Sequence, residues 1–517
     1  MRVVSFPCVL RIGVLLAGFV LVAAVAPGLT QTKNTAATAP TRADHAEVKP
    51  DKVPVTSSSK AARHDYELGM LNLQELFFEE EGLNDFRRAV KADPGFALGH
   101  AALAYFTNDP REEGREIALA KRSLPHAAPD EKLLIQFLVG TKDGDLIDAI
   151  SAINDLLAAY PKDSRLGNLY GGWLLNVQNF ARAQDVLQRV LKSDPKYYPA
   201  LNNLAYAYAM NGDFSRTSTL MEQYVAMLPR QPNPQDSYGE LLRMAGDFKG
   251  SIEHYRAALS IAPNFTDSQI GIASNYALMG DEERARVEYL RAIAMTSERT
   301  TKLQYRMLWA MTYYRANQSE QGRTEYSALA ALAHKEDLAV SEAECYRTMA
   351  LFNPQPEGAL KDLDAARHAL MEKHDLPRGE RETEFATVLQ TRAFIAARAG
   401  WPEVASRALD TLAAFAEKSR NNVVQSSYYS AHGAVLLLQG KYTGAATELQ
   451  EDPRDPLSLQ LLANAQEKAG QVPESAKTLA VLAAIYDERV ETAAIAQPMR
   501  DALRRTNSPP AQANSPE

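Results

Sequence analysis

Cysteine is nearly absent from this sequence of 517 residues, which contains only Cys8 and Cys345. Small secreted domains held together by disulfides need several cysteine pairs, so that class of fold is excluded. Cys345 lies in a stretch with a helical pattern and has no base beside it in the sequence. We therefore expect a packed, unreactive thiol at this position.

Runs of basic charge are also missing. The chain has 56 Lys and Arg against 64 Asp and Glu, a net charge of −8. Proteins that bind nucleic acid neutralise phosphates with clustered basic side chains, and no stretch here is long or one-sided enough to do so. Nucleic acid is therefore not an expected partner.

Signatures of catalysis are absent too. The sequence has no glycine-rich phosphate loop with lysine, no His-Glu-x-x-His motif and no nucleophile elbow. Ser57 to Lys60 matches Ser-x-x-Lys by chance in a segment of low complexity. The nearest approach to a metal cluster is His368, Glu372 and His374, and the spacing places the two histidines on different faces of a helix. We expect no cofactor and no metal, and an enzyme with its active site on a helical solenoid stays the alternative.

One apolar run stands at the N-terminus. Arg2 and Arg11 flank the run Ile12 to Val25, which ends in the small-residue pattern Ala24-Val25-Ala26. This is typical of a secretory signal peptide over residues 1–26, with the mature chain exported to the periplasm or secreted. The run is short of the roughly 20 residues of a spanning helix, although an uncleaved anchor in the inner membrane is the alternative. Cleavage removes two basic residues and leaves a charge of 54 − 64 = −10, with no stable membrane span.

Two segments have too few large apolar residues to fold. Residues 27–62 are rich in Thr, Ala, Ser, Lys and Pro, and residues 506–517 in Pro, Ser, Asn and Ala. Such compositions cannot bury enough surface to offset the entropy of ordering. We expect a disordered tether and a disordered tail.

The segment between them repeats itself with a period of 34 residues. Four prolines mark the period, with Ser297 in the next slot: Pro161, Pro195, Pro229 and Pro263. Small residues stand 12 residues before all five markers and 24 before four of them, with Phe137 as the exception. Large residues recur 21 and 8 residues before the later markers, as expected of paired helices that touch at the small positions. Gly-Asp pairs such as Gly212-Asp213 fit the turn between the two helices, where Gly ends one helix and Asp caps the next.

A period of 34 with these columns resembles the tetratricopeptide repeat family. The resemblance is strongest in Asn202 to Tyr208 and in Gly246 to Pro263. It implies an all-α fold, a tetratricopeptide-type superhelical solenoid of about twelve helix pairs. The expected division is degenerate N-terminal repeats at 63–129, five regular repeats at 130–299, divergent repeats at 300–374, C-terminal repeats at 382–489 and a capping helix at 490–505, with a hinge considered near 374–381.

The same resemblance places a binding surface. Residues 27, 23 and 20 before each marker share one face of the first helix of a unit, and in this family that face lines the concave groove. The row suggests a protein-interaction scaffold that holds a neutral or basic segment of a partner protein or peptide, while the other interpretation is an ordinary solvated helix face. The row comprises Asn168, Asn202, Tyr206, Asp236, Glu240, Arg243 and Ser274.

Overall fold

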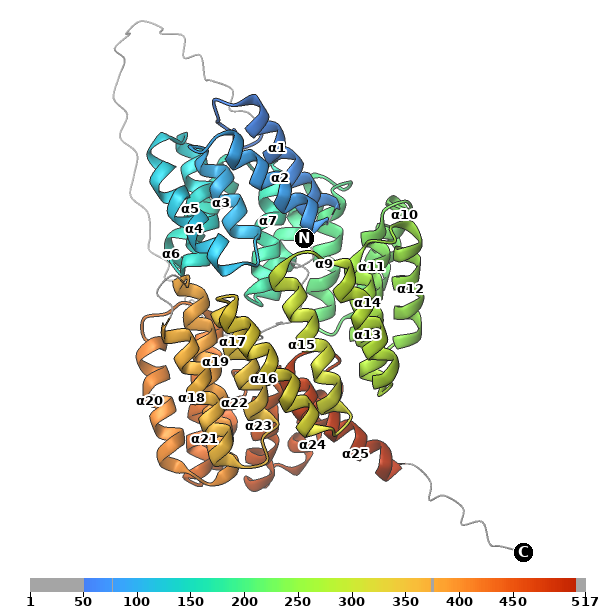
Figure 1. Ribbon diagram of the computed structural model, residues 1–517, viewed down its shortest axis with the longest axis vertical. Coiled ribbons are helices and arrows are strands. Elements are labelled where there is room, and N and C mark those ends of the chain that lie inside the picture. Colours follow the sequence, from blue (N-terminus) through green and yellow to red (C-terminus); the bar gives the residue numbers. More distant parts are fainter. Residues whose placement is uncertain (1–50, 77, 373–375, 508–517) are drawn as a thin grey trace, which may run out of the picture.

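The computed structural model describes residues 51–76, 78–372 and 376–507, and these fold into α-helices packed in consecutive antiparallel pairs (Figure 1). Twelve pairs are present in these ranges, followed by one further helix. The prediction of an all-α solenoid of about twelve helix pairs is confirmed. We number the pairs units 1 to 12 and call their members the first and second helix.

The helix bounds follow the repeat. Units 1 to 6 are α1 (Lys60–Leu71) with α2 (Glu79–Ala92), α3 (Ala97–Phe106) with α4 (Pro110–Ser123), α5 (Pro129–Asp143) with α6 (Leu146–Ala159), α7 (Ser164–Asn176) with α8 (Phe180–Ser193), α9 (Tyr198–Met210) with α10 (Phe214–Met227), and α11 (Pro232–Met244) with α12 (Phe248–Ile261). A π-helical turn, η1 (Asn72–Leu76), extends α1, and a 3-10 turn, η2 (Leu124–His126), follows α4.

Units 7 to 12 continue the array with longer helices in the divergent part. They are α13 (Thr266–Met279) with α14 (Glu282–Met295), α15 (Arg299–Arg315) with α16 (Ser319–Lys335), α17 (Ala339–Leu351) with α18 (Pro356–Glu372), α19 (Arg378–Ala399) with α20 (Pro402–Ala416), α21 (Asn422–Leu438) with α22 (Tyr442–Leu449), and α23 (Pro456–Lys468) with α24 (Val472–Ala483). The chain ends in a π-helical turn, η3 (Thr492–Ala496), and α25 (Gln497–Asn507).

The turn between the two helices of a unit follows the expected chemistry. Gly144, Gly212, Gly246 and Gly280 all have positive φ, between 77° and 85°. The Asp after the last three accepts a backbone N–H of the next helix, as Asp213 does from Arg216 at 3.1 Å. In the variant copy Gln178 takes the left-handed conformation at φ 59°, a position that costs a side chain more than it costs glycine.

The superhelix completes one turn in about seven units. Residues of one unit therefore contact the start of the unit about seven places later. Arg87 in unit 1 pairs with Glu298 before unit 8 at 2.9 Å, and Asn422 at unit 11 donates to the Val177 carbonyl of unit 4 at 2.6 Å. We call this line of contacts the seam; its other members are Arg111 with Asp337, Asp109 with Arg299, Lys142 with Gly379, Asn211 with Arg454, and Arg243 with Glu488. In Figure 1 the cyan helices α5 and α6 accordingly lie next to the orange units.

The C-terminal segment differs from the expected single capping helix. Residues 485–489 are irregular and follow unit 12, and η3 interrupts the helix before α25. Thr492 and Ala496 are fully buried, and Val490, Ala493 and Ile495 join the hydrophobic core. The segment is therefore part of the folded interior and occupies the place of a thirteenth unit.

The N-terminal boundary also differs from the expectation drawn from composition. Residues 51–59 are extended along the repeats and α1 begins at Lys60, where a disordered tether was expected to reach residue 62. Val53 is buried, Asp163 accepts its backbone N–H, and Glu131 accepts the backbone N–H of Thr56. These contacts with distant residues, which composition does not reveal, order the segment.

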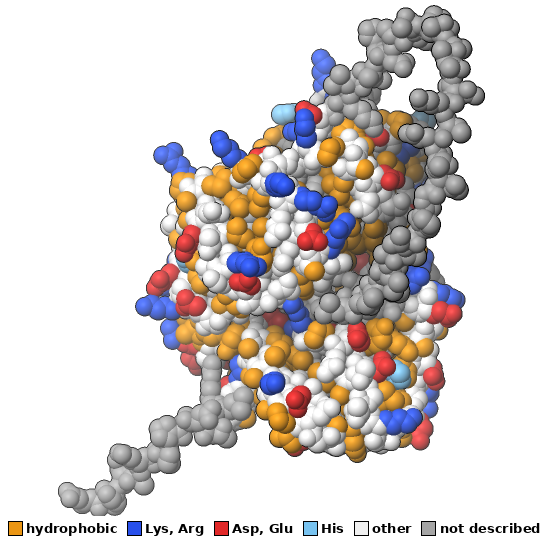
Figure 2. All heavy atoms as spheres, turned by 180° about the vertical axis from the view of Figure 1, so that it is seen from behind, with side chains coloured by type: hydrophobic (Ala, Val, Ile, Leu, Met, Phe, Trp, Pro, Cys, Tyr) orange, Lys and Arg blue, Asp and Glu red, His pale blue; other side chains and the backbone are white. Residues whose placement is uncertain are grey.

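Several predictions fall on residues outside the described ranges. These are the signal peptide at 1–26, residues 27–50 of the tether, His374 and residues 508–517 of the tail. Within the described ranges no helix combines the length and apolarity needed to cross a bilayer. Figure 2 shows basic and acidic side chains interspersed over one whole face of the molecule.

Candidate binding surface

The predicted row lies on the inner side of the superhelix, and most of it is buried. Asn168, Asn202 and Asp236 are completely buried, and Tyr206, Arg243 and Ser274 are at most 4% exposed. Glu240 keeps 27% of its side chain exposed. Little of the predicted row is therefore open to solvent.

Most of the row ties successive first helices together. Asn203 of unit 5 donates to Asn168 of unit 4 at 2.8 Å, and Ser268 of unit 7 donates to Asp236 of unit 6 at 2.7 Å. The Tyr206 hydroxyl donates to Glu240 in the next unit. Because buried polar groups need partners, this ladder fixes the spacing of the units as well as lining the interior.

The exceptional member is Asn202. Both atoms of its amide are buried, and neither has a hydrogen-bond partner among the described residues. The sequence predicted a polar contact at this position, and within the described part of the chain the fold supplies none.

Arg243 connects the row to the C-terminal segment. Its guanidinium pairs with Glu488 at 2.9 Å and with Glu240 at 3.5 Å, and Tyr486 packs edge-on against Phe248 in the same unit. Burial opposes the charge of Arg243, while Glu488 and Glu240 stabilise it, so its pKa lies above the usual range. Glu488 and its neighbours in the C-terminal segment therefore occupy this part of the inner face.

A second segment of the chain lies on the inner face of units 1 to 4. The Val53 N–H donates to Asp163 at 3.3 Å, the Thr56 N–H and hydroxyl donate to Glu131, and the Ser57 hydroxyl donates to Asp93. Sequence reasoning missed this contact, although Val53 and Val55 stand out as the aliphatic residues of a polar segment.

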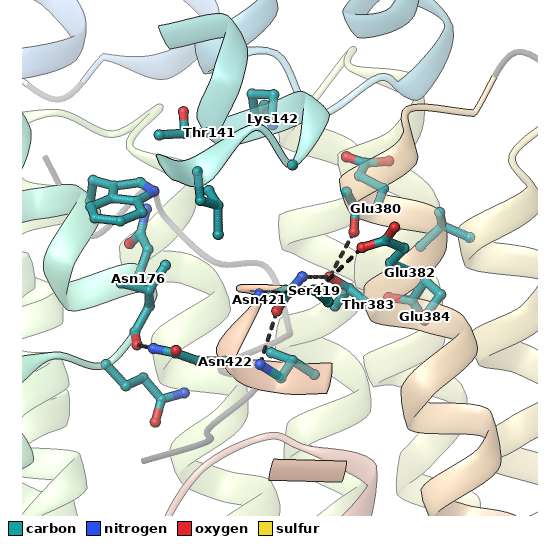
Figure 3. Close-up of a pocket in the computed structure, with 18 residues that line it drawn as sticks. Thr141, Lys142, Asn176, Glu380, Glu382, Thr383, Glu384, Ser419, Asn421 and Asn422 are labelled. Carbon is teal, nitrogen blue, oxygen red and sulfur yellow. Dashed lines mark hydrogen bonds between the residues drawn. The ribbon is translucent and has the colours of Figure 1, made fainter. Parts of the chain in front are cut away.

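A cavity of about 350 Å³ opens in the seam between units 3 and 4 and units 10 and 11 (Figure 3). Lys142, Trp173, Asn176, Glu380 and Glu382 are among the residues that line it. Much of its polar lining is already paired: Ser419 donates to Glu382 at 3.3 Å, and Asn421 donates to Thr383 at 2.7 Å.

Two residues that line this cavity, Lys142 and Glu380, belong to a cluster of buried charges with Glu113. The Lys142 ammonium lies 2.6 Å from the Glu113 carboxylate, which is 1% exposed. Burial, followed by the nearby Glu380, raises the pKa of Glu113 well above its usual range, while Lys142 lowers it. The three groups connect units 2 and 3 to unit 10.

The single cysteine of the described chain is consistent with a packed thiol. Cys345 is completely buried in α17. Burial raises the pKa of its thiol well above the usual range, and Glu344 and Glu342 add to the effect. A thiol with a raised pKa stays protonated and is a poor nucleophile.

Comparison with known proteins gives a match within the repeat array. Residues 186–216 match the tetratricopeptide repeat family. The TPR repeat-containing protein YpiA of Bacillus subtilis (strain 168) is 29% identical over 113 residues, which is 22% of this chain and 27% of YpiA. The matching region thus spans about a quarter of that curated relative.

Solved structures with similar folds include a tetratricopeptide repeat protein from Parabacteroides merdae ATCC 43184, with a TM-score of 0.34 and 15% identity over 47% of this chain and 97% of that one. A chain of the APC/C hetero-tetramer Cut9-Hcn1 has a TM-score of 0.41 and 14% identity over 80% of this chain and 78% of that one. The family match thus places a tetratricopeptide-type repeat at residues 186–216, within the array of helix pairs.

Proposed function

We propose that this protein is a scaffold that binds an extended segment of a partner protein on the inner face of its superhelix. The observation that supports this is the position of residues 51–57, a non-repeat segment that lies on the first helices of units 1 to 4. Tetratricopeptide repeat proteins generally act by binding other proteins, and a rigid array of helices suits that role. An enzymatic role has no comparable support.

The predicted row belongs to the same inner face, and Glu240 is its accessible member. Glu240 joins Tyr206 and Arg243, so a partner that reaches the row would meet it first. Asn202, Asp236 and Ser274 are buried, and replacing them would disturb the packing of the units together with any binding.

The test is affinity capture of partners from an extract of the source cell. The bait is the full chain, compared with Glu240→Ala and with Glu253→Ala, which removes an exposed carboxylate from the outer helix α12. A partner retained by wild type and Glu253→Ala but reduced several-fold by Glu240→Ala supports the proposal. Equal retention by all three baits moves the site away from the row.

We further propose that the chain works outside the cytoplasm, in the periplasm or after secretion. The basis is the n-region, the apolar run and the small-residue site that ends at Ala26. Mass measurement of the protein recovered from its native cell tests this proposal. A mature chain that begins at Pro27 supports export with cleavage, whereas a membrane-bound chain that begins at Met1 replaces it with the anchor.

A further inference from the structure

Residues 51–57 lie in a fixed register on the inner face. Their contacts step backwards through the repeats, from Asp163 at the start of unit 4 to Glu131 in unit 3 and Asp93 at the end of unit 1. Two of these contacts use backbone N–H groups, so they recognise the course of an extended chain and leave its side chains free to vary.

Side-chain recognition in this segment is concentrated at Val53, which is 5% exposed. It lies with Val55 against an apolar wall that comprises Tyr66, Met70, Leu98, Leu134, Leu166 and Leu169. A remaining cavity of about 30 Å³ borders this contact. Pro54 biases Val53 toward the extended conformation, which lowers the entropy lost when the segment docks.

The two terminal segments are held in different ways. Residues 490–496 of the C-terminal segment are built into the hydrophobic core, and their release would open that core. In the N-terminal segment only Val53 is buried, while Asp51, Lys52 and Thr56 are exposed. The N-terminal segment can therefore leave its groove at a much lower cost in buried apolar surface.

We infer that the groove over units 1 to 4 is an exchangeable peptide site, filled by the chain's own residues 51–57 until a partner segment replaces them. The partner segment is extended, has a proline flanked by aliphatic residues, and carries a hydroxyl residue after them. This inference rests on the proposed function and adds the location and chemistry of the partner.

Attachment to α1 gives the internal segment an advantage over any free peptide. Residues joined by a short linker compete at an effective concentration on the order of millimolar. A free peptide of equal intrinsic affinity therefore binds weakly to the wild-type chain and more tightly once the internal segment is weakened.

The experiment uses the full chain and a fluorescein-labelled peptide with the sequence of residues 51–59. Binding is followed by fluorescence anisotropy for wild type, for Val53→Asp, and for Val481→Asp, which makes the same change at a valine that is 51% exposed on α24. We expect Val53→Asp to bind the peptide at least ten-fold more tightly than the other two chains. A peptide that carries the Val53→Asp change should not bind any of them.

A second variant tests the groove itself. Glu131→Gln, added to Val53→Asp, weakens the acceptor for the Thr56 N–H and should reduce peptide affinity at least three-fold. Because Glu131 also accepts the Ala128 N–H at the start of α5, the melting temperature of this chain is measured alongside. A loss of affinity with an unchanged melting temperature assigns the effect to the peptide contact.

Equal affinity of the three single chains for the peptide would overturn the inference. So would a wild-type dimer that Val53→Asp dissociates, because the groove would then take the segment of a second copy. The inference and the proposed function can fail separately. If a partner is captured in a way that depends on Glu240 but the peptide does not exchange, the proposed scaffold function stands and only the exchangeable peptide site is rejected. Peptide exchange without any captured partner would support the groove and remove the support for the scaffold function.

Discussion

At the scale of single residues, the distance between the two helices of a unit decides which side chains are allowed. A Cβ on Gly239 would lie 3.0 Å from the Ser251 carbonyl oxygen and 3.1 Å from the Tyr255 ring. A Cβ on Gly171 would lie 2.6 Å from Leu187 in the second helix of the same unit. These positions belong to the column of small residues, so the period alone identified where the helices touch.

Gly239→Leu should therefore lower the free energy of unfolding by about 1 to 3 kcal/mol, because the added side chain overpacks the contact between α11 and α12. Thermal or urea unfolding followed by circular dichroism measures the change. The control is Gly444→Leu, at an exposed helical glycine. A Cβ there would lie no closer than 3.6 Å to another side chain, that of Leu436. A variant at 239 that unfolds like this control contradicts the role given to the small column.

Glu282 is a buried carboxyl group, and among the described residues neither of its oxygens has a hydrogen-bond partner. It is 8% exposed, and burial raises its pKa to about 7, against the opposing effect of Arg315 and Arg286. In the unfolded chain the group ionises near 4.5. The folded state therefore holds the proton over a range of pH in which the unfolded state has lost it, and stability falls as the pH rises from about 4.5 to about 7.

Glu282→Gln removes this ionisation and should remove the corresponding fall in stability. Each unit of pKa difference is worth about 1.4 kcal/mol, so the variant should gain up to about 3 kcal/mol relative to wild type between pH 4 and pH 8. Urea unfolding at several pH values checks this, with the exposed neighbour Glu283→Gln as the control. Parallel stability curves for Glu282→Gln and wild type would contradict this, because they would show that Glu282 ionises at the same pH in the folded and unfolded states.

At the scale of elements, the C-terminal segment acts as a structural closure. Arg347 of α17 is 2% exposed and pairs with Glu491, whose side chain is 8% exposed. Removing one member of a buried ion pair leaves an uncompensated charge in the interior, which costs more than removing both.

Glu491→Gln should accordingly destabilise the chain by about 3 kcal/mol, and the double variant Arg347→Met with Glu491→Met by less than that. Urea unfolding of the single and double variants gives the comparison. A double variant at least as unstable as Glu491→Gln would mean that the pair itself stabilises the fold, and that the remaining charge does not explain the loss.

The helices, their turns and the shared face of the row could be predicted because all depend on residues within one period. Gly246 and Asp247 specify a turn, and the spacing of Asp236, Glu240 and Arg243 specifies a face. The burial of Arg243 could not be predicted, because it depends on Glu488 and Tyr486, more than 240 residues away, which reach Arg243 only after a full turn of the superhelix. Val53 was missed for the same reason, since its partner Asp163 lies 110 residues along the chain.

At the scale of the whole molecule, twelve units at about seven per turn give a superhelix whose second turn rests on its first. Polar contacts hold much of the seam, including the pairs of Arg87, Arg111 and Arg299 with acidic residues of the facing units. Exposed and half-exposed ion pairs contribute little each and are screened by salt. The hydrophobic contacts within each unit are unaffected by their loss.

Removal of these three arginines should therefore separate the turns without unfolding the helices. We expect the chain with Arg87→Ala, Arg111→Ala and Arg299→Ala to have a larger radius of gyration in small-angle X-ray scattering, and an unchanged helical content by circular dichroism. The matched control replaces Arg182, Arg189 and Arg291 with alanine. These are exposed residues on second helices, and they bond to Asn179, Asp185 and Glu288 in their own helix or its cap. High salt should expand the wild-type chain in the same direction, because the seam pairs are screened. Equal radii for the two triple variants would mean that the apolar packing of the C-terminal segment closes the superhelix alone, and that the seam pairs only follow from that closure.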